Sequence, residues 1–187
     1  VPIGTGLLFS HESWEEVVVG IEICEDLWAP VPPSSYQAVA GATIIVNPSA
    51  SNEIIAKSEY RRDLVRQQSA RLNAGYLYCS SGYGESTTDL VFGGDALIYE
   101  KGALLARSRR FQTESQLVVA DMDVEAILHD RQLQSSFGDS VDILEGHVYE
   151  ECLFSACDAQ DCLRSVNPQP FVPADTARRN ERCEEIF

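Results

Sequence analysis

One cysteine of this sequence stands where a reactive thiol would be expected. Residues 17–23 are an apolar stretch that predicts a strand, and Cys24 follows it directly, ahead of Glu25 and Asp26. Open α/β sheets present reactive side chains where a strand ends, because the strand gives a rigid base and the turn leaves open space. The segment alone is equally compatible with an inert cysteine in the core, a common fate of this residue.

Two other groups of residues invite a chemical interpretation that their spacing does not support. The Gly-rich stretch 82–89 lacks the terminal Gly-Lys-Ser/Thr of a phosphate-binding loop, and its Glu85 and Asp89 would repel phosphate. His147 and the C-terminal cysteines could form a zinc site, but they lack the tight Cys-x2-Cys spacing of a zinc knuckle. We therefore predict no metal site, and free thiols at Cys152, Cys157, Cys162 and Cys183.

The composition restricts the partners of the protein. With 14 basic against 29 acidic residues, the formal charge is −15, a field that repels phosphate backbones, so we expect no nucleic-acid partner. No apolar run approaches the ~20 residues of a membrane span, and no signal peptide opens the chain, so we expect no membrane partner. The six scattered cysteines then indicate reduced thiols in a cytoplasmic protein.

The elements that would position Cys24 alternate between strands and helices. Strands are predicted over 6–9, 17–23, 43–46 and 76–79, and helices over 34–40 and 58–74. In the longer helix an i, i+4 stripe runs from Tyr60 to Leu72, and Gly75 is placed to end it. This alternation is typical of a layered α/β fold.

Further along, the pattern changes to a hairpin, a strand and a helix, predicted over 96–106, 117–120 and 124–134. Gly102 lies in the hairpin turn, where a positive φ is needed. Beyond Ser140 the periodicity fades and several prolines follow. We therefore predict a folded part over residues 1–140 and a linker over residues 141–187.

Four segments together resemble a known family. Residues 20–28 (Gly-Ile-Glu-Ile-Cys-Glu-Asp-Leu-Trp) are similar to the nucleophile segment of the nitrilase, or carbon–nitrogen hydrolase, superfamily. Segments 47–52, 84–89 and 118–123 narrow the resemblance to the glutaminase domain of glutamine-dependent NAD⁺ synthetases, over about residues 1–137. The resemblance implies an α/β fold, a nitrilase-like α-β-β-α sandwich. This chain would be its C-terminal half, with residues 141–187 leading toward an absent synthetase domain.

The resemblance implies a specific chemistry for Cys24. In that family a cysteine thiolate attacks the side-chain amide of glutamine and releases ammonia, and water hydrolyses the resulting thioester. Ammonia passes to the synthetase domain, where ATP and Mg²⁺ are expected to support amidation of nicotinic acid adenine dinucleotide to NAD⁺. The resemblance implies no cofactor for the chain itself.

The family's other catalytic groups are a glutamate base and a lysine that stabilises the oxyanion. Both lie well before the cysteine in the family, and only 23 residues precede Cys24 here. The chain also begins with Val1-Pro2, without an initiator Met. We therefore expect a piece of a longer protein that lacks the N-terminal half of its domain and is inactive when isolated.

The resemblance also assigns residues to the substrate glutamine. Ser51 and Lys57 match positions that contact it, the first through a hydroxyl and the second through a charge for the α-carboxylate. Glu25 is expected near the substrate, but not as the base, since adjacent residues at a strand end point in diverging directions. The alternatives are a turn serine, a solvated lysine and a surface carboxylate.

Two other functions stay open at this point. The chain could be a nitrilase-like half that serves as a non-catalytic interaction module, with Cys24 unused, or part of a stand-alone amidase. In each case half of a two-sheet sandwich would leave apolar faces and strand edges uncovered. We therefore expect a homo-oligomer, or an unstable chain when it is studied alone.

Overall fold

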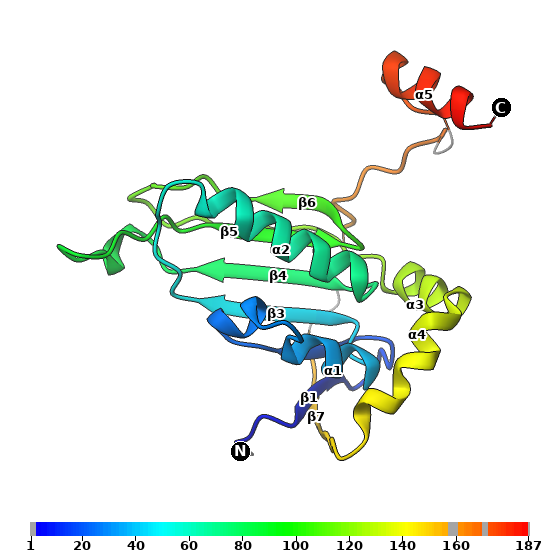
Figure 1. Ribbon diagram of the computed structural model, residues 1–187, viewed down its shortest axis with the longest axis horizontal. Helices are drawn as coiled ribbons and strands as arrows, with labels where there is room; N and C mark the ends of the chain where they lie inside the picture. The colour runs from blue at the N-terminus through cyan, green and yellow to red at the C-terminus, as the bar shows by residue number, and fades with distance from the viewer. Residues whose placement is uncertain (1–2, 157–160, 170–171, 187) are drawn as a thin grey trace.

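The computed structural model of the chain describes residues 3–156, 161–169 and 172–186. The strands of this part form one mixed sheet in the order β6-β5-β4-β3-β2-β1-β7 (Figure 1). The bounds of the strands are β1 Leu7–His11, β2 Val18–Ile21, β3 Ile44–Ser49, β4 Gly75–Ser80, β5 Ala96–Glu100, β6 Ala103–Arg107 and β7 Glu150–Phe154.

Strands β2, β3 and β4 run parallel, so their carboxyl ends meet at one edge of the sheet. The 3-10 helix η1 (Cys24–Trp28) follows β2 at this edge, and the loop 50–56 follows β3. The loop 81–95, which contains the short 3-10 helix η2 (Tyr83–Glu85), follows β4. The topology therefore brings the segments that carry the candidate residues to the same edge.

Helices α1 (Pro33–Val39) and α2 (Lys57–Arg71) lie over one face of the sheet (Figure 1). Pro33 begins α1, where its missing N–H removes no helical hydrogen bond. Val65 of α2 is fully buried against the sheet. The core beneath the helices includes Ile45, Tyr76, Tyr78 and Leu97.

The end of α2 differs from the prediction. The helix ends at Arg71, and Asn73 rather than Gly75 has a left-handed backbone, with φ 43°. Gly75 begins β4, where a Cβ atom would collide with the sulfur of Met122. The prediction of Gly75 as helix terminator is therefore wrong, and the residue serves close packing instead.

Helix α3 (Val124–Leu133) confirms the prediction for 124–134 to within one residue. It packs near the C-terminal ends of α1 and α2. Its Arg131 is buried and donates to the carbonyls of Ala42 (2.8 Å), Leu72 (3.1 Å) and Asn73 (3.0 Å). Burial lowers the pKa of Arg131 to about 10. These bonds satisfy carbonyls that helices leave without partners at their ends.

The second part of the chain confirms one strand prediction and overturns another. The hairpin of β5 and β6 forms as predicted, with Gly102 at φ 82°. The predicted strand over 117–120 is wrong: no sheet partner pairs with it among the described residues, and Leu117 is 89% exposed. The continuous apolar run (Leu-Val-Val-Ala) therefore does not form a strand by itself, since a strand also needs a sheet edge to pair with.

The segment expected to be a linker differs from that expectation as well. Within residues 141–187, β7 pairs in parallel with β1 along its whole length. It covers an edge of β1 that β2 leaves free, and backbone groups at such an edge favour another strand. The segment also contains the end of η3 (Asp139–Leu144), which follows α4 (Ser135–Gly138), and the helix α5 (Thr176–Ile186).

Candidate active site

Cys24 opens η1 directly beyond β2. Its backbone lies in the left-handed region with φ 52°, an uncommon conformation for a residue with a side chain. The thiol is free and the residue is partly exposed. The Asp26 carboxylate accepts the Ile23 N–H at 2.7 Å and so fixes the turn into η1. A sharp turn that presents a partly exposed side chain at a strand end is suited to a nucleophile.

The Asn47 side chain, on β3, faces both the N–H and the carbonyl of Cys24. Its Oδ1 accepts the Cys24 N–H at 3.1 Å, and its Nδ2 lies 3.5 Å from the Cys24 carbonyl oxygen. Ser49 also donates its hydroxyl to the Asn47 Oδ1 at 2.7 Å. Asn47 is fully buried, so these bonds face no competition from water.

Two further buried side chains extend this arrangement away from Cys24. The Asn47 Nδ2 donates to the Tyr76 hydroxyl at 3.2 Å, and that hydroxyl donates to the Glu22 carboxylate. The other oxygen of Glu22 accepts the Ser34 N–H at 2.8 Å. Burial first, and then the charge of Glu22, raises the pKa of Tyr76 well above its ordinary value. We call Glu22, Asn47 and Tyr76 the nucleophile network.

The sequence analysis missed the roles of the nucleophile network. A signal was present in Glu22, because a carboxylate inside an apolar strand must find partners when it is buried. Its partners could not be read from the chain, since Tyr76 lies 54 residues away.

Ser51 is buried in the loop that follows β3, and Arg61 of α2 holds it. The Arg61 Nη2 donates to the Ser51 Oγ at 3.4 Å. The Arg61 Nη1 forms ion pairs with Glu53 at 2.9 Å and with Asp95 at 3.2 Å. Arg61 is 0% exposed, so its charge depends on these partners.

Two more arginines complete this cluster. Asp95 accepts from Arg107 Nε at 3.0 Å, and Glu53 accepts from Arg110 Nη1 at 3.2 Å. We call Glu53, Arg61, Asp95, Arg107 and Arg110 the arginine network. It links the loop 50–56, which carries Ser51, to α2, β6 and the loop before β5.

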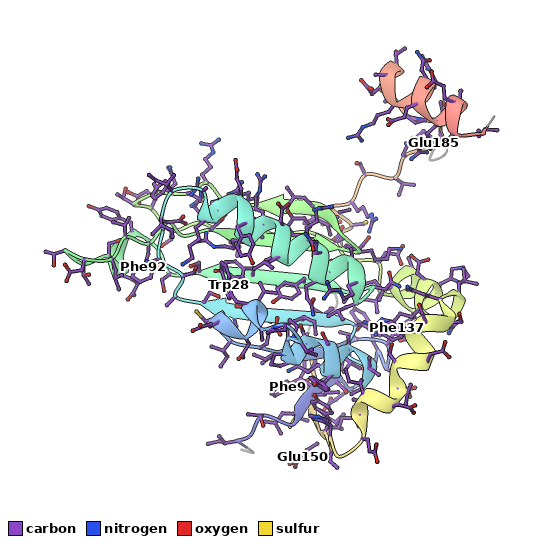
Figure 2. All side chains as sticks on the ribbon, viewed as in Figure 1. Phe9, Trp28, Phe92, Phe137, Glu150 and Glu185 are labelled. Carbon is purple, nitrogen blue, oxygen red and sulfur yellow. The ribbon has the colours of Figure 1, made fainter. Side chains whose placement is uncertain are left out.

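Lys57 begins α2 and lies beside the Cys24 segment. Its Nζ donates to the Asn52 Oδ1 at 2.7 Å and lies 5.6 Å from the centroid of the Trp28 ring. Trp28, labelled in Figure 2, also packs on Tyr60 of α2, with ring centroids 5.2 Å apart. These contacts bring Lys57 against η1, which Cys24 begins. Glu25 is exposed beside Cys24 and makes no hydrogen bond to the described residues.

The surroundings of the thiol are open. Within the described part of the chain, no carboxylate or lysine forms a hydrogen bond with the Cys24 sulfur. A surface hollow of about 700 Å³ lies elsewhere, over the arginine network, and its lining includes Glu53, Ile54, Arg62 and Phe111 but not Cys24. The described residues therefore supply a partly exposed thiol, with no hydrogen-bonded base and no closed pocket around it.

The described residues contain no group of three or more side chains that could hold a metal ion. Of the cysteines considered for zinc, Cys157 lies outside the described residues, and Cys152, Cys162 and Cys183 are free thiols. Among the same residues, no helix has the length and apolar character needed to cross a bilayer.

The chain is similar over its whole length to curated enzymes. The glutamine-dependent NAD(+) synthetase of Mycobacterium bovis is 40% identical over 192 residues, which is 100% of this chain and 28% of that protein. The enzyme of the same name from Homo sapiens is 30% identical over 128 residues, covering 68% of this chain and 17% of that protein. The chain therefore spans little more than a quarter of the length of its first relatives. No family model matches it.

Solved structures agree with these relatives. A glutamine-dependent NAD(+) synthetase from Cytophaga hutchinsonii matches with a TM-score of 0.50 and 31% identity, over 61% of this chain and 17% of that chain. Saccharomyces cerevisiae Nit3, a member of the nitrilase superfamily, matches with a TM-score of 0.53 and 21% identity, over 62% of this chain and 41% of that chain.

An amidase mutant from Nesterenkonia sp. AN1 also matches, with a TM-score of 0.53 and 18% identity, over 73% of this chain and 48% of that chain. At such identities the likeness shows the fold alone. The family resemblance and the nitrilase-like α/β fold expected from the motifs are both confirmed. The chain is a homologue, along its whole length, of one part of the glutamine-dependent NAD⁺ synthetases and has a nitrilase-like fold.

Proposed function

We propose that this chain is the cysteine-bearing part of the glutaminase domain of a glutamine-dependent NAD⁺ synthetase. The observation that carries the proposal is the setting of Cys24, a partly exposed thiol on a left-handed turn beyond a parallel strand. Hydrogen bonds from Asn47 hold its backbone, while its thiol forms no hydrogen bond with the described residues. The 40% identity to NAD⁺ synthetases supports the same function.

The proposed reaction proceeds through a thioester. The Cys24 sulfur, deprotonated, attacks the side-chain carbonyl carbon of glutamine and forms a tetrahedral oxyanion. Collapse of the oxyanion breaks the carbon–nitrogen bond, and the nitrogen takes up a proton and leaves as ammonia. Water then attacks the γ-glutamyl thioester, which releases glutamate and restores the thiol.

Glutamine would be held by residues at the same sheet edge. Lys57 begins α2 beside η1 and offers a charge to the α-carboxylate, and Ser51 offers a hydroxyl. The Ser51 hydroxyl already accepts a bond from Arg61, so its own proton is free to be donated to the substrate. Glu25, exposed beside Cys24, would face the amino end of the substrate.

The general base and the oxyanion-stabilising cation would come from outside this chain. None of the described residues forms a hydrogen bond with the thiol, as a general base or an oxyanion-stabilising cation would be expected to do in this site. ATP and Mg²⁺ would act in a separate synthetase domain of the cytoplasmic whole protein. The 187 residues alone, supplied with glutamine, should release no ammonia.

The sheet face opposite α1 and α2 supports a missing partner layer. Ile21, Val46 and Leu77 pair side by side across β2, β3 and β4 and point away from the helices. None of the three is buried, and Ile21 is 42% exposed. An apolar row of this kind on a sheet is unfavourable in water and favours association. We propose that the N-terminal half of the domain covers it, or a second copy when that half is absent.

This proposal about the sheet face is tested by sedimentation. The chain alone should self-associate, and adding the N-terminal half in trans should convert it to a defined complex. The substitution Leu77→Lys should weaken self-association, whereas Leu104→Lys on the outer strand β6 should not. A stable, cooperatively folding monomer of the unaltered chain would contradict the proposal.

The glutaminase proposal is tested in the complete protein that carries this chain. A glutamine-derived diazo-ketone should label Cys24 and abolish glutamine-dependent NAD⁺ synthesis, and Cys24→Ala should do the same. Synthesis from added ammonia should survive in both cases, because only the ammonia source is lost. Labelling of the exposed Cys79 with Cys24 untouched would overturn the assignment.

A non-catalytic interaction module is the second candidate. The open surroundings of the Cys24 thiol favour it, since no described group is placed to activate the sulfur. The same experiment separates the two candidates. A module would leave glutamine-dependent synthesis unchanged in the Cys24→Ala variant.

A further inference from the structure

We propose that Asn47 is a positioning residue for the nucleophile, and that Tyr76 and Glu22 set the direction in which its amide points. The proposal rests on the glutaminase function proposed above and adds residues to its machinery. Asn47 forms hydrogen bonds with the backbone of Cys24 only, and the other two side chains form none with Cys24 among the described residues. None of the three would contact the reacting atoms.

Asn47 bonds a residue, Cys24, whose backbone conformation is unfavourable. At φ 52° Cys24 adopts a conformation that residues with a Cβ atom rarely hold without support. Asn47 supplies that support on both sides, because its Oδ1 accepts the Cys24 N–H and its Nδ2 faces the Cys24 carbonyl. The direction of the Cys24 Cα–Cβ bond, and with it the position of the sulfur, depends on this turn.

The amide of Asn47 can face Cys24 in only one orientation. The Glu22 carboxylate accepts from the Ser34 N–H on one oxygen and from the Tyr76 hydroxyl on the other. The single proton of Tyr76 is thereby used, so its oxygen can only accept from Asn47. The Nδ2 group of Asn47 must turn toward Tyr76, which leaves Oδ1 for the Cys24 N–H.

Two further observations agree with this direction. Ser49 donates its hydroxyl to the same Oδ1, so in this orientation that oxygen accepts from both Ser49 and the Cys24 N–H. Glu22, Asn47 and Tyr76 are each at most 1% exposed, so water cannot substitute for a lost partner. Glu22 lies two residues before Cys24 in sequence. Its carboxylate thus fixes the orientation of the Asn47 amide through Tyr76 of β4, and Asn47 of β3 in turn holds the Cys24 backbone.

The chain offers a matched pair of tyrosines for the test. Tyr76 and Tyr78 lie on the same face of β4 and are both buried. Among the described residues the Tyr78 hydroxyl has no hydrogen-bond partner, whereas that of Tyr76 has two. Replacing either residue with phenylalanine removes one oxygen from the same layer, but only Tyr76→Phe releases the Asn47 amide.

The experiment uses the complete protein and measures kcat and KM for glutamine, synthesis from ammonia, and the rate at which iodoacetamide modifies Cys24. We expect Asn47→Leu to lower kcat about 10²-fold with KM unchanged, as a misplaced catalytic group does. Tyr76→Phe should lower kcat and slow the modification of Cys24 in the same direction, and Tyr78→Phe should change neither. Synthesis from ammonia should stay constant throughout.

Each outcome tests either the positioning proposal or the glutaminase function on which it rests. If Cys24→Ala retains glutamine-dependent synthesis, the glutaminase function fails. If Cys24→Ala abolishes it while Asn47→Leu and Tyr76→Phe match Tyr78→Phe in kcat, only the positioning proposal is overturned. If Asn47→Leu does not fold, Tyr76→Phe decides alone. A rise in KM at constant kcat would also overturn the proposal, because it would place Asn47 in substrate binding.

Discussion

The nucleophile network and the arginine network support the same edge of the sheet by different physical means. The nucleophile network has a single carboxylate and no cation, and hydrogen bonds alone join its members. The arginine network has two carboxylates and three arginines, joined largely by ion pairs. Hydrogen bonds weaken steeply with angle, whereas ion pairs depend mainly on distance. The first network therefore suits the orientation of one side chain, and the second suits the anchoring of a loop.

The difference has consequences for how each network should fail. A lost hydrogen bond in the nucleophile network leaves neutral groups and a single carboxylate, so the fold should survive and the turn at Cys24 should loosen. A lost cation in the arginine network leaves buried carboxylates that repel one another. Substitutions there should affect stability first.

The largest effect is expected from Arg61→Met. The substitution keeps an unbranched apolar stem but removes the guanidinium group that faces Glu53 and Asp95 in a fully buried position. Removing one partner of a buried ion pair costs about 3–5 kcal/mol, and Arg107 and Arg110 remain to limit the loss. We therefore expect the free energy of unfolding to fall by about 3 kcal/mol, measured by urea unfolding.

The matched control for this substitution is Arg66→Met on the same helix. Arg66 is 53% exposed, and its pair with Asp63 spans 3.7 Å, so the change should stay within about 0.5 kcal/mol. Equal losses in the two variants would mean that the arginine network does not depend on its buried charge.

A smaller effect on stability is expected from Tyr76→Phe. The substitution leaves the Asn47 Nδ2 and one Glu22 oxygen each short of a buried partner, which costs about 1–3 kcal/mol. Tyr78→Phe removes a hydroxyl without a described partner and should be neutral or slightly stabilising. Urea unfolding of both variants checks this. Equal changes would show that the hydroxyl of Tyr76 contributes nothing beyond its volume.

The nucleophile network and the proposed glutamine-binding Lys57 should also separate in kinetics, with a smaller effect at Lys57. Lys57→Met removes the charge proposed to hold the α-carboxylate, while Cys24 and its turn are untouched. We expect KM for glutamine to rise about tenfold with kcat nearly constant, the signature of lost uniform binding. Lys101→Met, which removes a lysine paired with Asp130 in the hairpin turn, serves as the control. A fall in kcat at constant KM would contradict the separation.

Local patterns predicted the part of the site that lies next to Cys24 in sequence. Apolar runs and their polar ends placed Cys24 after a strand and Lys57 near the start of a helix, and the structure has both. The strand edges could not be assigned in the same way. The apolar residues at 117–120 remain outside the sheet, whereas β7 joins β1 from 150–154, because pairing depends on which edge is free.

The buried polar groups were less accessible to sequence reasoning. Arg61 and Asp95 each look like surface residues in the chain, since charged residues are rarely buried without partners. They are buried because the fold brings them together across 34 residues of sequence. Glu22 alone carried a local signal, as a carboxylate inside a strand. Tertiary contacts, which no period in the sequence records, decide the rest.

The smallest effect concerns pH and again distinguishes the nucleophile network. Burial, and then the charge of Glu22, raises the pKa of Tyr76 in the folded chain well above 10.0, the value it has when unperturbed. Below about pH 10 both states keep the proton, and this contribution to stability is intact. Above it only the unfolded chain loses the proton, so the free energy of unfolding falls as pH rises toward the folded value.

Tyr76→Phe has no such proton, so its stability should decline less steeply between about pH 10 and about pH 11 than that of the unaltered chain. Subtracting the free energy of unfolding of one protein from that of the other removes the contribution of every titrating group that the two proteins share. Urea unfolding at a series of pH values measures it, and the destabilisation caused by Tyr76→Phe should shrink as pH rises. Parallel curves would mean that Tyr76 ionises as readily in the fold as in the unfolded chain. Its hydroxyl would then be poorly coupled to Glu22, and the fixed direction of the Asn47 amide would lose its cause.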